Sequence, residues 1–343
     1  INATKGKENV SPFLLQSHLD QVDTRVTKEE PYEKWLDVPI YNVLEDGGIK
    51  GLNSSNGADG QSGIAVMMAI AEYHNNFTHG PIELLCTVDE ETIMSGAIGL
   101  EENLLKSKYY ICLDGFMMND LIIGSASTIT HYYLLKVELD LFYAYKYNIE
   151  LSGFKSGHSG LTIQDNKANS FKWLAIFLTN LNEQSYEYKL SRINYGEKDN
   201  VIPAGLYFEM ATNITEIEMN QLIDELIKNI TIQHPIEDSI TKSITLLELN
   251  NDTSYDSEKI IKLINEINNG VIDYDEENEF VITSQNMGLI QQNESSKYIL
   301  LVSLKRSSND TVTNDSYNEC LRIANLTDST CVIDNDTLVP SWQ

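Results

Sequence analysis

The sequence has few basic residues and no long apolar run. No apolar stretch approaches the roughly 20 residues that span a bilayer, so we expect no transmembrane segment. Lys and Arg total 24 against 51 Asp and Glu, which gives a net charge of -27. Such an acidic chain is repelled by nucleic-acid phosphates and by anionic membrane surfaces. We therefore expect neither nucleic acid nor a membrane as a partner.

Cysteine is also scarce, and the four cysteines lack the paired spacing that is typical of zinc sites. Cys86 and Cys112 lie in apolar runs, where we expect buried thiols. Cys320 and Cys331 could pair only in an oxidising compartment. Asn-X-Ser/Thr triplets recur along the chain and leave secretion open, although an Asn-rich sequence produces such triplets by chance. Our prediction is a cytoplasmic protein.

The length of the chain indicates its number of domains, and its first residues indicate the nature of its N-terminus. A chain of 343 residues with 42% hydrophobic residues favours two domains with substantial cores. The start, Ile1 to Glu8, has neither an apolar signal core nor an initiator methionine. We therefore expect the N-terminus to be a cut within a longer chain.

Three consecutive acids follow an apolar run in the first part of the chain. Residues 82–88 are rich in apolar and β-branched side chains and come after a Gly-Pro breaker, which predicts a buried strand. Asp89, Glu90 and Glu91 then emerge where the strand ends. Clustered like charges are costly unless a cation or a shared proton compensates them. A bound metal is one explanation, and a solvated acidic turn is the other.

A second apolar run ends in His18 and Asp20, which the period of a strand places on one face. A carboxylate beside an imidazole can fix the tautomer of a metal-binding histidine, although a surface histidine has the same pattern. Asp59 lies in a glycine-rich loop before an apolar helix, where it either caps the helix or binds a ligand. A helix is predicted over residues 96–107, and a further strand, predicted from Tyr109, ends in Asp114.

Alternating strands and helices predict a mainly parallel α/β sheet for this part of the chain. One imidazole and several carboxylates would then meet at one edge of the sheet, which describes a site for a divalent metal. After Gly124 paired strands alternate with single helices, as in an α+β domain of ferredoxin-like type that is plausibly duplicated. His158, Asn200 and Arg306 stand out there, but a turn His, a turn Asn and a surface Arg are the simpler interpretations.

Taken together, these motifs resemble those of the aminoacyl-histidine dipeptidases, a branch of the dinuclear zinc superfamily that includes carboxypeptidase G, carnosinase and aminoacylase. The matching motifs extend over nearly the whole chain and are Leu15–Val22, Gly57–Asp59, His79–Leu85, Glu90–Glu91, Ser95–Leu100, Leu113–Asp114, Gly157–Gly160, Asn200–Pro203, Thr283–Gly288 and Pro340–Gln343.

The resemblance implies a role for each candidate residue and a cofactor of two divalent ions, with zinc expected. His18 and Asp114 would bind one ion, Glu91 would bind the other, and Asp59 would bridge the two. Asp20 would orient His18, and Glu90 would be the general base that takes a proton from a metal-bridging water.

The same resemblance assigns the second domain to the substrate. His158 would reach the carbonyl oxyanion, and Asn200 and Arg306 would hold carbonyl or carboxylate groups of the substrate once the two domains close. The substrate would be a dipeptide or another short peptide, and a homodimer is a further expectation.

Some positions depart from the family pattern. Ser17 replaces a Gly before the His, Gly60 and Gln61 replace an Asn-Gly pair, and Asp199 stands where an Arg often precedes Asn200. In the family the chain also returns to the first domain with another metal-binding His and a Glu, whereas this sequence stops at Gln343. As given, the second ion therefore lacks its third protein ligand.

The resulting fold prediction is an α/β zinc-peptidase catalytic domain with an inserted α+β lid. We expect an incomplete metal-binding domain over 1–127, a lid or dimerisation domain over 128–335, and the start of a returning catalytic segment over 336–343. The function predicted is metal-dependent hydrolysis of a peptide bond. Two alternatives are a non-catalytic homologue that has lost the second metal site and an amidohydrolase of N-acyl amino acids.

Overall fold

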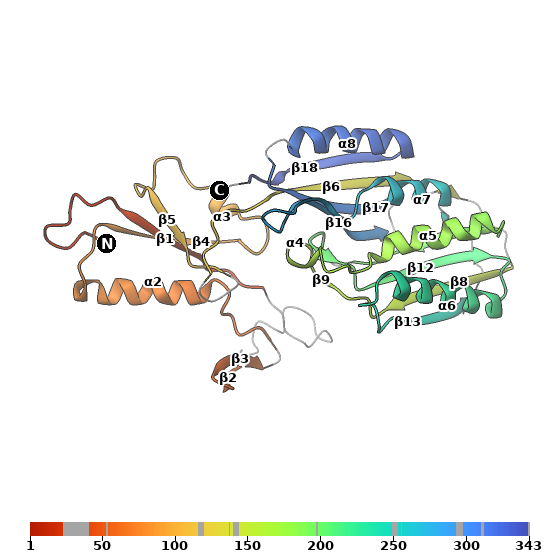
Figure 1. The fold of residues 1–343 in the computed structure, drawn as a ribbon, viewed down its shortest axis with the longest axis horizontal. Helices are drawn as coiled ribbons and strands as arrows, with labels where there is room; N and C mark the ends of the chain where they lie inside the picture. The colour runs from red at the N-terminus through yellow and green to blue at the C-terminus, as the bar shows by residue number, and fades with distance from the viewer. Residues whose placement is uncertain are drawn as a thin grey trace. The chain divides into compact units, whose positions relative to one another are not determined.

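The computed structural model of the chain, drawn in Figure 1, divides it into two compact units, Ile1–Ile122 and Ile123–Gln343. The structure describes residues 1–22, 41–52, 54–115, 120–136, 138–139, 144–196, 198–248, 253–254, 256–292, 298–309 and 312–341. The three domain ranges predicted from the sequence, 1–127, 128–335 and 336–343, stay predictions.

The first unit is built on a three-stranded parallel sheet. Its strands are β1 (Phe13–His18), β4 (Ile82–Thr87) and β5 (Tyr109–Cys112), in the order β4-β1-β5. The helix α2 (Gln61–Tyr73) packs against β1, which is the central strand and is almost wholly buried. Because all three strands run in the same direction, their carboxyl ends lie at one edge of the sheet. The predicted parallel α/β arrangement is confirmed.

The remaining elements of this unit are short. They are the hairpin strands β2 (Tyr41–Glu45) and β3 (Gly48–Leu52), the 3-10 helix η1 (His74–Asn76) and the helix α3 (Ser95–Ile98).

The helix predicted over residues 96–107 is wrong beyond its first turn. α3 ends at Ile98, and Asn103 has a positive φ of 64° that an α-helix does not contain. The backbone amides of Lys106 and Ser107 donate instead to the side-chain carboxylate of Glu83 on β4. Contacts with the neighbouring strand therefore replace helical hydrogen bonds in this segment.

In the described part of the second unit, the two largest sheets are antiparallel, and each has two helices. The elements of the first sheet follow the order strand, helix, strand, strand, helix, strand, and are β8 (Tyr145–Ser152), α5 (Ser170–Glu183), β10 (Tyr188–Ile193), β12 (Gly205–Thr212), α6 (Glu216–Gln233) and β13 (Thr241–Leu247). The strand order β10-β12-β8-β13 is that of a ferredoxin-like sheet.

The second sheet repeats this topology with one additional strand, β15. Its elements are β6 (Ser127–Lys136), α7 (Ser257–Glu266), β15 (Gly270–Asp275), β16 (Phe280–Gln292), β17 (Tyr298–Ser307), α8 (Val312–Thr327) and β18 (Thr330–Val339). The order is β15-β16-β17-β6-β18. The duplicated ferredoxin-like prediction is therefore confirmed, and the first repeat is inserted in the second between β6 and α7.

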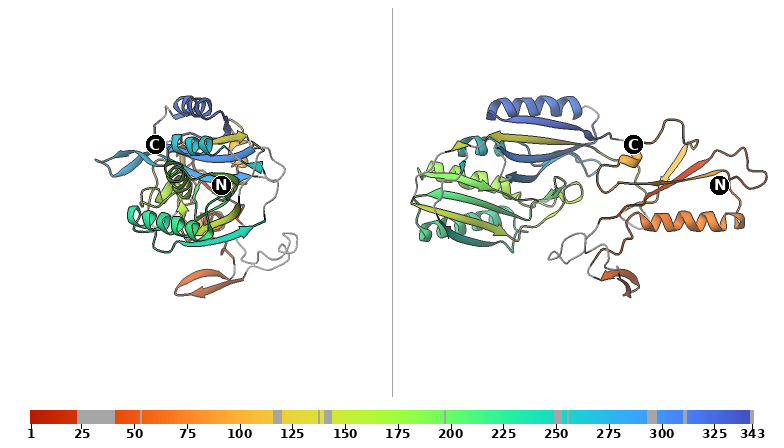
Figure 2. Two further views of the ribbon diagram at one scale, coloured as in Figure 1. Left: turned by 90° about the vertical axis from the view of Figure 1, so that its right-hand side faces the viewer. Right: turned by 180° about the vertical axis from the view of Figure 1, so that it is seen from behind.

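The two repeats share one hydrophobic core. α5 packs against α7, and α8 lies along β18 and β6, as Figure 2 shows. Fully buried aromatic side chains from different elements, such as Tyr133, Phe171 and Phe208, belong to one contiguous cluster. Side-chain caps begin three of the helices: Asn169 for α5, Thr215 for α6 and Asp256 for α7.

Short elements complete the second unit. They are the pair β7 (Glu138–Leu139) and β14 (Thr253–Ser254), the pair β9 (Gly157–His158) and β11 (Val201–Ile202), and the helix α4 (Ser159–Thr162). None of the helices in the described ranges combines the length and the apolar character that crossing a bilayer requires.

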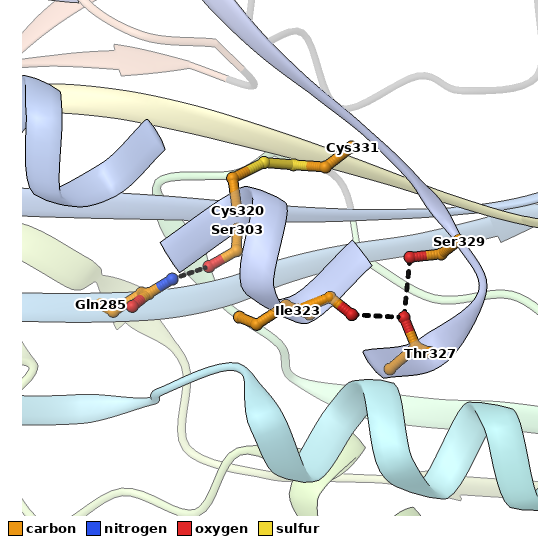
Figure 3. Close-up of a disulfide and its surroundings, with 7 residues drawn as sticks. All are labelled: Gln285, Ser303, Cys320, Ile323, Thr327, Ser329 and Cys331. Carbon is orange, nitrogen blue, oxygen red and sulfur yellow. Dashed lines mark hydrogen bonds between the residues drawn. A yellow bond between two sulfur atoms is a disulfide. The ribbon is translucent and has the colours of Figure 1, made fainter. Parts of the chain in front are cut away.

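The cysteines divide into one pair and two free thiols. A disulfide joins Cys320 on α8 to Cys331 on β18, 11 residues later, with their Cα atoms 6.0 Å apart (Figure 3). Cys86 and Cys112 are free and exposed, so the prediction of buried thiols is wrong. They lie on β4 and β5, the two outer strands of a sheet of three, where a strand has only one neighbour to cover it.

His131 is a buried titratable group in the second sheet. It lies on β6 between Ser303 of β17 and Ile333 of β18, it is fully buried, and neither ring nitrogen has a hydrogen-bond partner among the described residues. Burial lowers the pKa of His131 to about 4; Glu319 opposes this shift and Lys305 adds to it. The imidazole is therefore neutral in the folded protein at neutral pH.

This burial predicts a loss of stability in mild acid. Because the folded pKa of about 4 lies below the unfolded value of about 6.5, the unfolded chain binds more protons between these two pH values. The contribution of His131 to stability is full above pH ~6.5 and is lost as the pH falls toward 4. Urea denaturation at pH 7 and pH 5 measures it. Between pH 7 and pH 5, the loss of unfolding free energy should be about 2 kcal/mol smaller in His131→Phe than in the parent. An unchanged pH dependence of the unfolding free energy would contradict the lowered pKa of His131.

Candidate metal centre

His18 is the last residue of β1 and lies at the carboxyl edge of the parallel sheet. Its side chain is only 1% exposed. Nδ1 lies 2.8 Å from the carbonyl oxygen of Asp20 and donates its proton to it, because a carbonyl oxygen can only accept. This contact leaves Nε2 as the nitrogen with a lone pair, which is the state in which an imidazole binds a metal ion.

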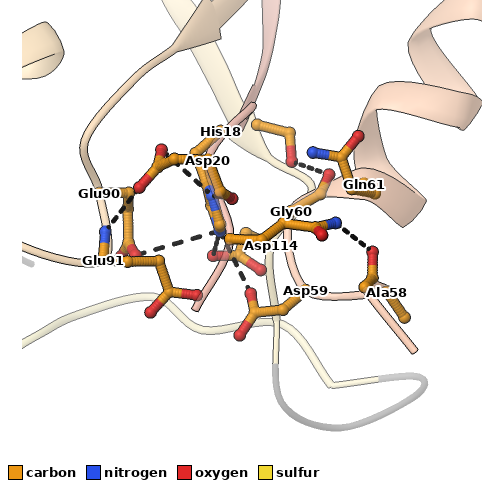
Figure 4. A network of polar contacts seen from close by, with 12 residues as sticks. His18, Asp20, Ala58, Asp59, Gly60, Gln61, Glu90, Glu91 and Asp114 are labelled. Atoms are coloured by element: carbon orange, nitrogen blue, oxygen red, sulfur yellow. Dashed lines mark hydrogen bonds and ion pairs between the residues drawn. The ribbon is translucent and has the colours of Figure 1, made fainter. Parts of the chain in front are cut away.

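Carboxylates from three other segments surround His18 Nε2 (Figure 4). The distances are 3.2 Å to Asp59 Oδ1, 3.6 Å to Asp114 Oδ2 and 4.0 Å to Glu90 Oε2. Asp59 comes from the loop before α2, and Glu90 and Asp114 come from the turns after β4 and β5. The predicted convergence on one edge of the sheet is thus present in the structure.

Glu91 completes the cluster. One donor atom from each of His18, Asp59 and Glu91 lies within 4.8 Å of the others, a spacing that allows all three to bind one ion. The backbone amide of Glu91 also donates to Asp20 Oδ2 at 3.0 Å. The position of Glu91 therefore depends on the same aspartate whose carbonyl orients His18.

Asp20 contacts His18 in a different way from the one we predicted. Its carbonyl oxygen makes the 2.8 Å contact with Nδ1, while its carboxylate Oδ1 lies 3.6 Å away. That Oδ1 is buried and has no hydrogen-bond partner within the described part of the chain. The residue connects the end of β1 with the acidic turn after β4.

Gly60 explains why the loop before α2 is rich in glycine. Its φ is 69°, and a Cβ at this position would lie 2.6 Å from the ring of His18. Its carbonyl oxygen accepts a hydrogen bond of 2.6 Å from the buried hydroxyl of Ser17. Ser17, a departure from the family pattern, thus ties β1 to the loop that carries Asp59. Sequence reasoning missed this contact because it joins residues 43 positions apart.

Asp89 lies outside the cluster. It has a positive φ of 66°, its side chain accepts a hydrogen bond from the hydroxyl of Thr92, and its carbonyl accepts from the amide of Met94 at 2.6 Å. These contacts shape the turn after β4. Asp89 therefore supports the backbone that presents Glu90 and Glu91.

The crowded carboxylates have raised pKa values. Burial raises the pKa of Asp114, and the nearby charge of Asp59 raises it further, although His18 opposes the shift. Burial also raises the pKa of Glu90; His18 lowers it, and the charges of Asp114, Glu91 and Asp59 raise it again. Carboxylates at these distances are stabilised by a bound cation or by a shared proton.

The donor set fits a divalent metal. One imidazole nitrogen and several carboxylate oxygens from separate segments are the ligand types of catalytic zinc sites. A pocket of about 490 Å³ opens beside Glu90 and Asp114 and is lined mostly by apolar side chains such as Leu14, Leu85 and Met94.

The three predicted substrate residues lie close together within the second unit. His158 on β9 pairs with Val201 on β11, and the amide of Ser159 donates to the carbonyl of Asn200 at 2.8 Å. Arg306 Nη1 donates to Ser159 Oγ at 2.6 Å. A Cβ on Gly160 would lie 2.9 Å from His158 and 3.1 Å from Arg306 Nε, so both side chains border the same glycine.

These features define a class of protein: an α/β unit with a histidine and several carboxylates at the strand ends, followed by a duplicated ferredoxin-like unit. No family model matches the chain. It is 28% identical over 319 residues to the cytosol non-specific dipeptidase of Escherichia coli (strain K12), a match that covers 90% of this chain and 65% of that protein. The chain thus spans about two thirds of the length of this relative.

A solved structure gives the same result. The crystal structure of the aminoacylhistidine dipeptidase from Vibrio alginolyticus matches with a TM-score of 0.75 and 25% sequence identity, over 100% of this chain and 70% of that chain. The two comparisons confirm the predicted resemblance to this branch of peptidases and the predicted fold. The roles of individual site residues stay predictions.

If Glu91 is a metal ligand, Glu91→Ala should lower the zinc content of the protein. The loss of one carboxylate donor should weaken zinc binding at least tenfold, which mass spectrometry and a competition titration with a chelator measure. Glu72→Ala, which removes an exposed carboxylate from α2, is the matched control and should bind zinc like the parent. An unchanged zinc content in Glu91→Ala would remove this residue from the ligand set.

Proposed function

We propose that the protein hydrolyses the peptide bond of dipeptides or short peptides in a metal-dependent reaction. The observation that carries the proposal is the buried His18 with Asp59, Glu90 and Asp114 within 4.0 Å of its Nε2. The dipeptidase names of the two similar proteins support it. A peptide substrate is also consistent with an acidic chain that repels nucleic acid.

Two divalent ions, expected to be zinc, would be held by the residues of the cluster. We propose His18 and Asp114 for one ion, Glu91 for the other and Asp59 between them. When bound, such ions polarise a carbonyl group and lower the pKa of water. Asp20 keeps Nε2 of His18 available, because its carbonyl oxygen accepts a hydrogen bond from the N–H group at Nδ1.

Glu90 is the proposed general base. Its carboxylate lies 4.0 Å from His18 Nε2, at the rim of the cluster, and it is 43% exposed. In this role Glu90 takes a proton from the attacking water and passes it to the nitrogen of the leaving amine. Burial raises its pKa above that of an ordinary glutamate, and the charges of the neighbouring carboxylates add to this shift.

In the second unit we propose that His158, Asn200 and Arg306 bind the substrate. Burial and the nearby Arg306 lower the pKa of His158, so its imidazole is neutral and can donate a hydrogen bond to the carbonyl oxygen of the substrate. Arg306 offers the planar guanidinium that pairs with carboxylates. Asn200 Oδ1 is buried without a hydrogen-bond partner in the described ranges, so it is available to accept a hydrogen bond from an N–H group of the substrate.

A cytoplasmic location and a homodimer are the remaining proposals. The name of the Escherichia coli relative, a cytosol non-specific dipeptidase, supports the location. The disulfide between Cys320 and Cys331 is a bond typical of oxidising compartments, so secretion is the alternative to the proposed cytoplasmic location.

The test of the proposed reaction is Glu90→Gln in the zinc-loaded protein. An amide cannot take a proton from water, so kcat for dipeptides should fall by roughly 10²- to 10⁴-fold, while the zinc content stays that of the parent. Glu101→Gln, at an exposed position of the same unit, is the matched control and should keep its activity. Full activity in Glu90→Gln would reject Glu90 as the base, and a parent protein that cleaves no dipeptide would reject the proposed function.

A further inference from the structure

Asp199 is a second charged residue beside the proposed substrate residues of the second unit. Its carboxylate Oδ2 accepts a hydrogen bond of 2.9 Å from the buried hydroxyl of Thr130 on β6. Its carbonyl oxygen accepts one of 2.8 Å from Nδ2 of Asn286, a buried side chain on β16. Contacts with both strands therefore fix the position of Asp199.

Asp199 lies near Arg306, because its carboxylate accepts a hydrogen bond from Thr130, two residues along β6 from Thr128, which pairs with Arg306. Burial lowers the pKa of the Arg306 guanidinium, and the negative charge of Asp199 raises it again. Arg306 directs Nη1 to Ser159 Oγ at 2.6 Å, and Asp199 is held by Thr130. Hydrogen bonds with two hydroxyl groups thus fix the positions of the two charged side chains.

The charges of His158, Asp199 and Arg306 balance one another. His158 carries no charge at neutral pH, because burial and Arg306 both lower its pKa. Arg306 supplies one positive charge and Asp199 one negative charge. A substrate that brings a single carboxylate to Arg306 therefore adds one negative charge beside Asp199. A second carboxylate on the substrate meets repulsion, whereas an ammonium or guanidinium group is attracted.

We propose that Asp199 sets the charge preference of this site, so that dipeptides with a basic or neutral side chain bind better than those with an acidic one. The inference rests on the proposed function, since it assigns a substrate class to the same site. Asp199 acts through its electric field and is a specificity residue. Its effect should therefore appear in KM, with little change in kcat, and should diminish at high salt.

The experiment compares Gly-Lys, Gly-Leu and Gly-Glu as substrates of the zinc-loaded protein and of Asp199→Asn. The parent should prefer Gly-Lys over Gly-Glu by roughly tenfold or more in kcat/KM at low salt. Asp199→Asn should reduce the ratio of kcat/KM for Gly-Lys to kcat/KM for Gly-Glu to about threefold or less. In the parent, 0.5 M KCl should also reduce this ratio. Asparagine keeps an oxygen that can accept from Thr130, so the fold is retained, and Asp199→Glu, which keeps the charge, should preserve the preference.

Asp328→Asn is the matched control. This carboxylate is 85% exposed and pairs with Lys259 at 2.8 Å. It lies at the other end of β6, because Thr330 pairs with Leu134 whereas Arg306 pairs with Thr128. The variant removes one negative charge from the chain but leaves the charge of the site unchanged. Its ratio of kcat/KM for Gly-Lys to kcat/KM for Gly-Glu should therefore equal that of the parent.

Two results separate this inference from the proposed function. Cleavage of Gly-Leu together with equal kcat/KM for Gly-Lys and Gly-Glu, or an unchanged ratio in Asp199→Asn, would overturn the role of Asp199 and leave the peptidase proposal intact. A protein that cleaves none of the three would contradict the proposed function. Calorimetric binding of the same dipeptides would then decide the inference, and equal affinities for Gly-Lys and Gly-Glu would overturn it.

Discussion

The concentration of negative charge around one buried imidazole is the constraint on which the first unit depends. Asp59, Asp114 and Glu90 approach His18 Nε2 from three segments, and burial raises the pKa values of Glu90 and Asp114. A cation is the natural compensation for such an arrangement. The parallel sheet makes the arrangement possible, since it delivers the ends of β1, β4 and β5 to one edge.

A large part of this site could be predicted from the sequence because strand ends are local features. The apolar runs before His18, Glu90 and Asp114 define where each strand stops, and parallel strands must bring these ends together. Asp59 was recognisable from the glycines around it. The duplicated ferredoxin-like topology followed from the alternation of paired strands and single helices, which the orders of the two sheets confirm.

Contacts between distant residues could not be predicted in this way. Two hydrogen bonds depend on packing that no local pattern encodes. One runs from Ser17 to Gly60, and the other from the Ser107 amide to the Glu83 carboxylate. The exposure of Cys86 depends on how many strands flank β4. Asp199 was visible as a departure from a family pattern, but its charge interaction with Arg306 appears only in the folded chain.

The central claim is that His18 and the carboxylates around it bind metal. Anomalous diffraction at the zinc absorption edge, from crystals of the zinc-loaded protein, tests it most directly. The account predicts an anomalous peak at bonding distance, about 2.0–2.2 Å, from His18 Nε2 and from a carboxylate oxygen of Asp59. A zinc-loaded protein whose anomalous peaks all lie away from His18 would contradict it.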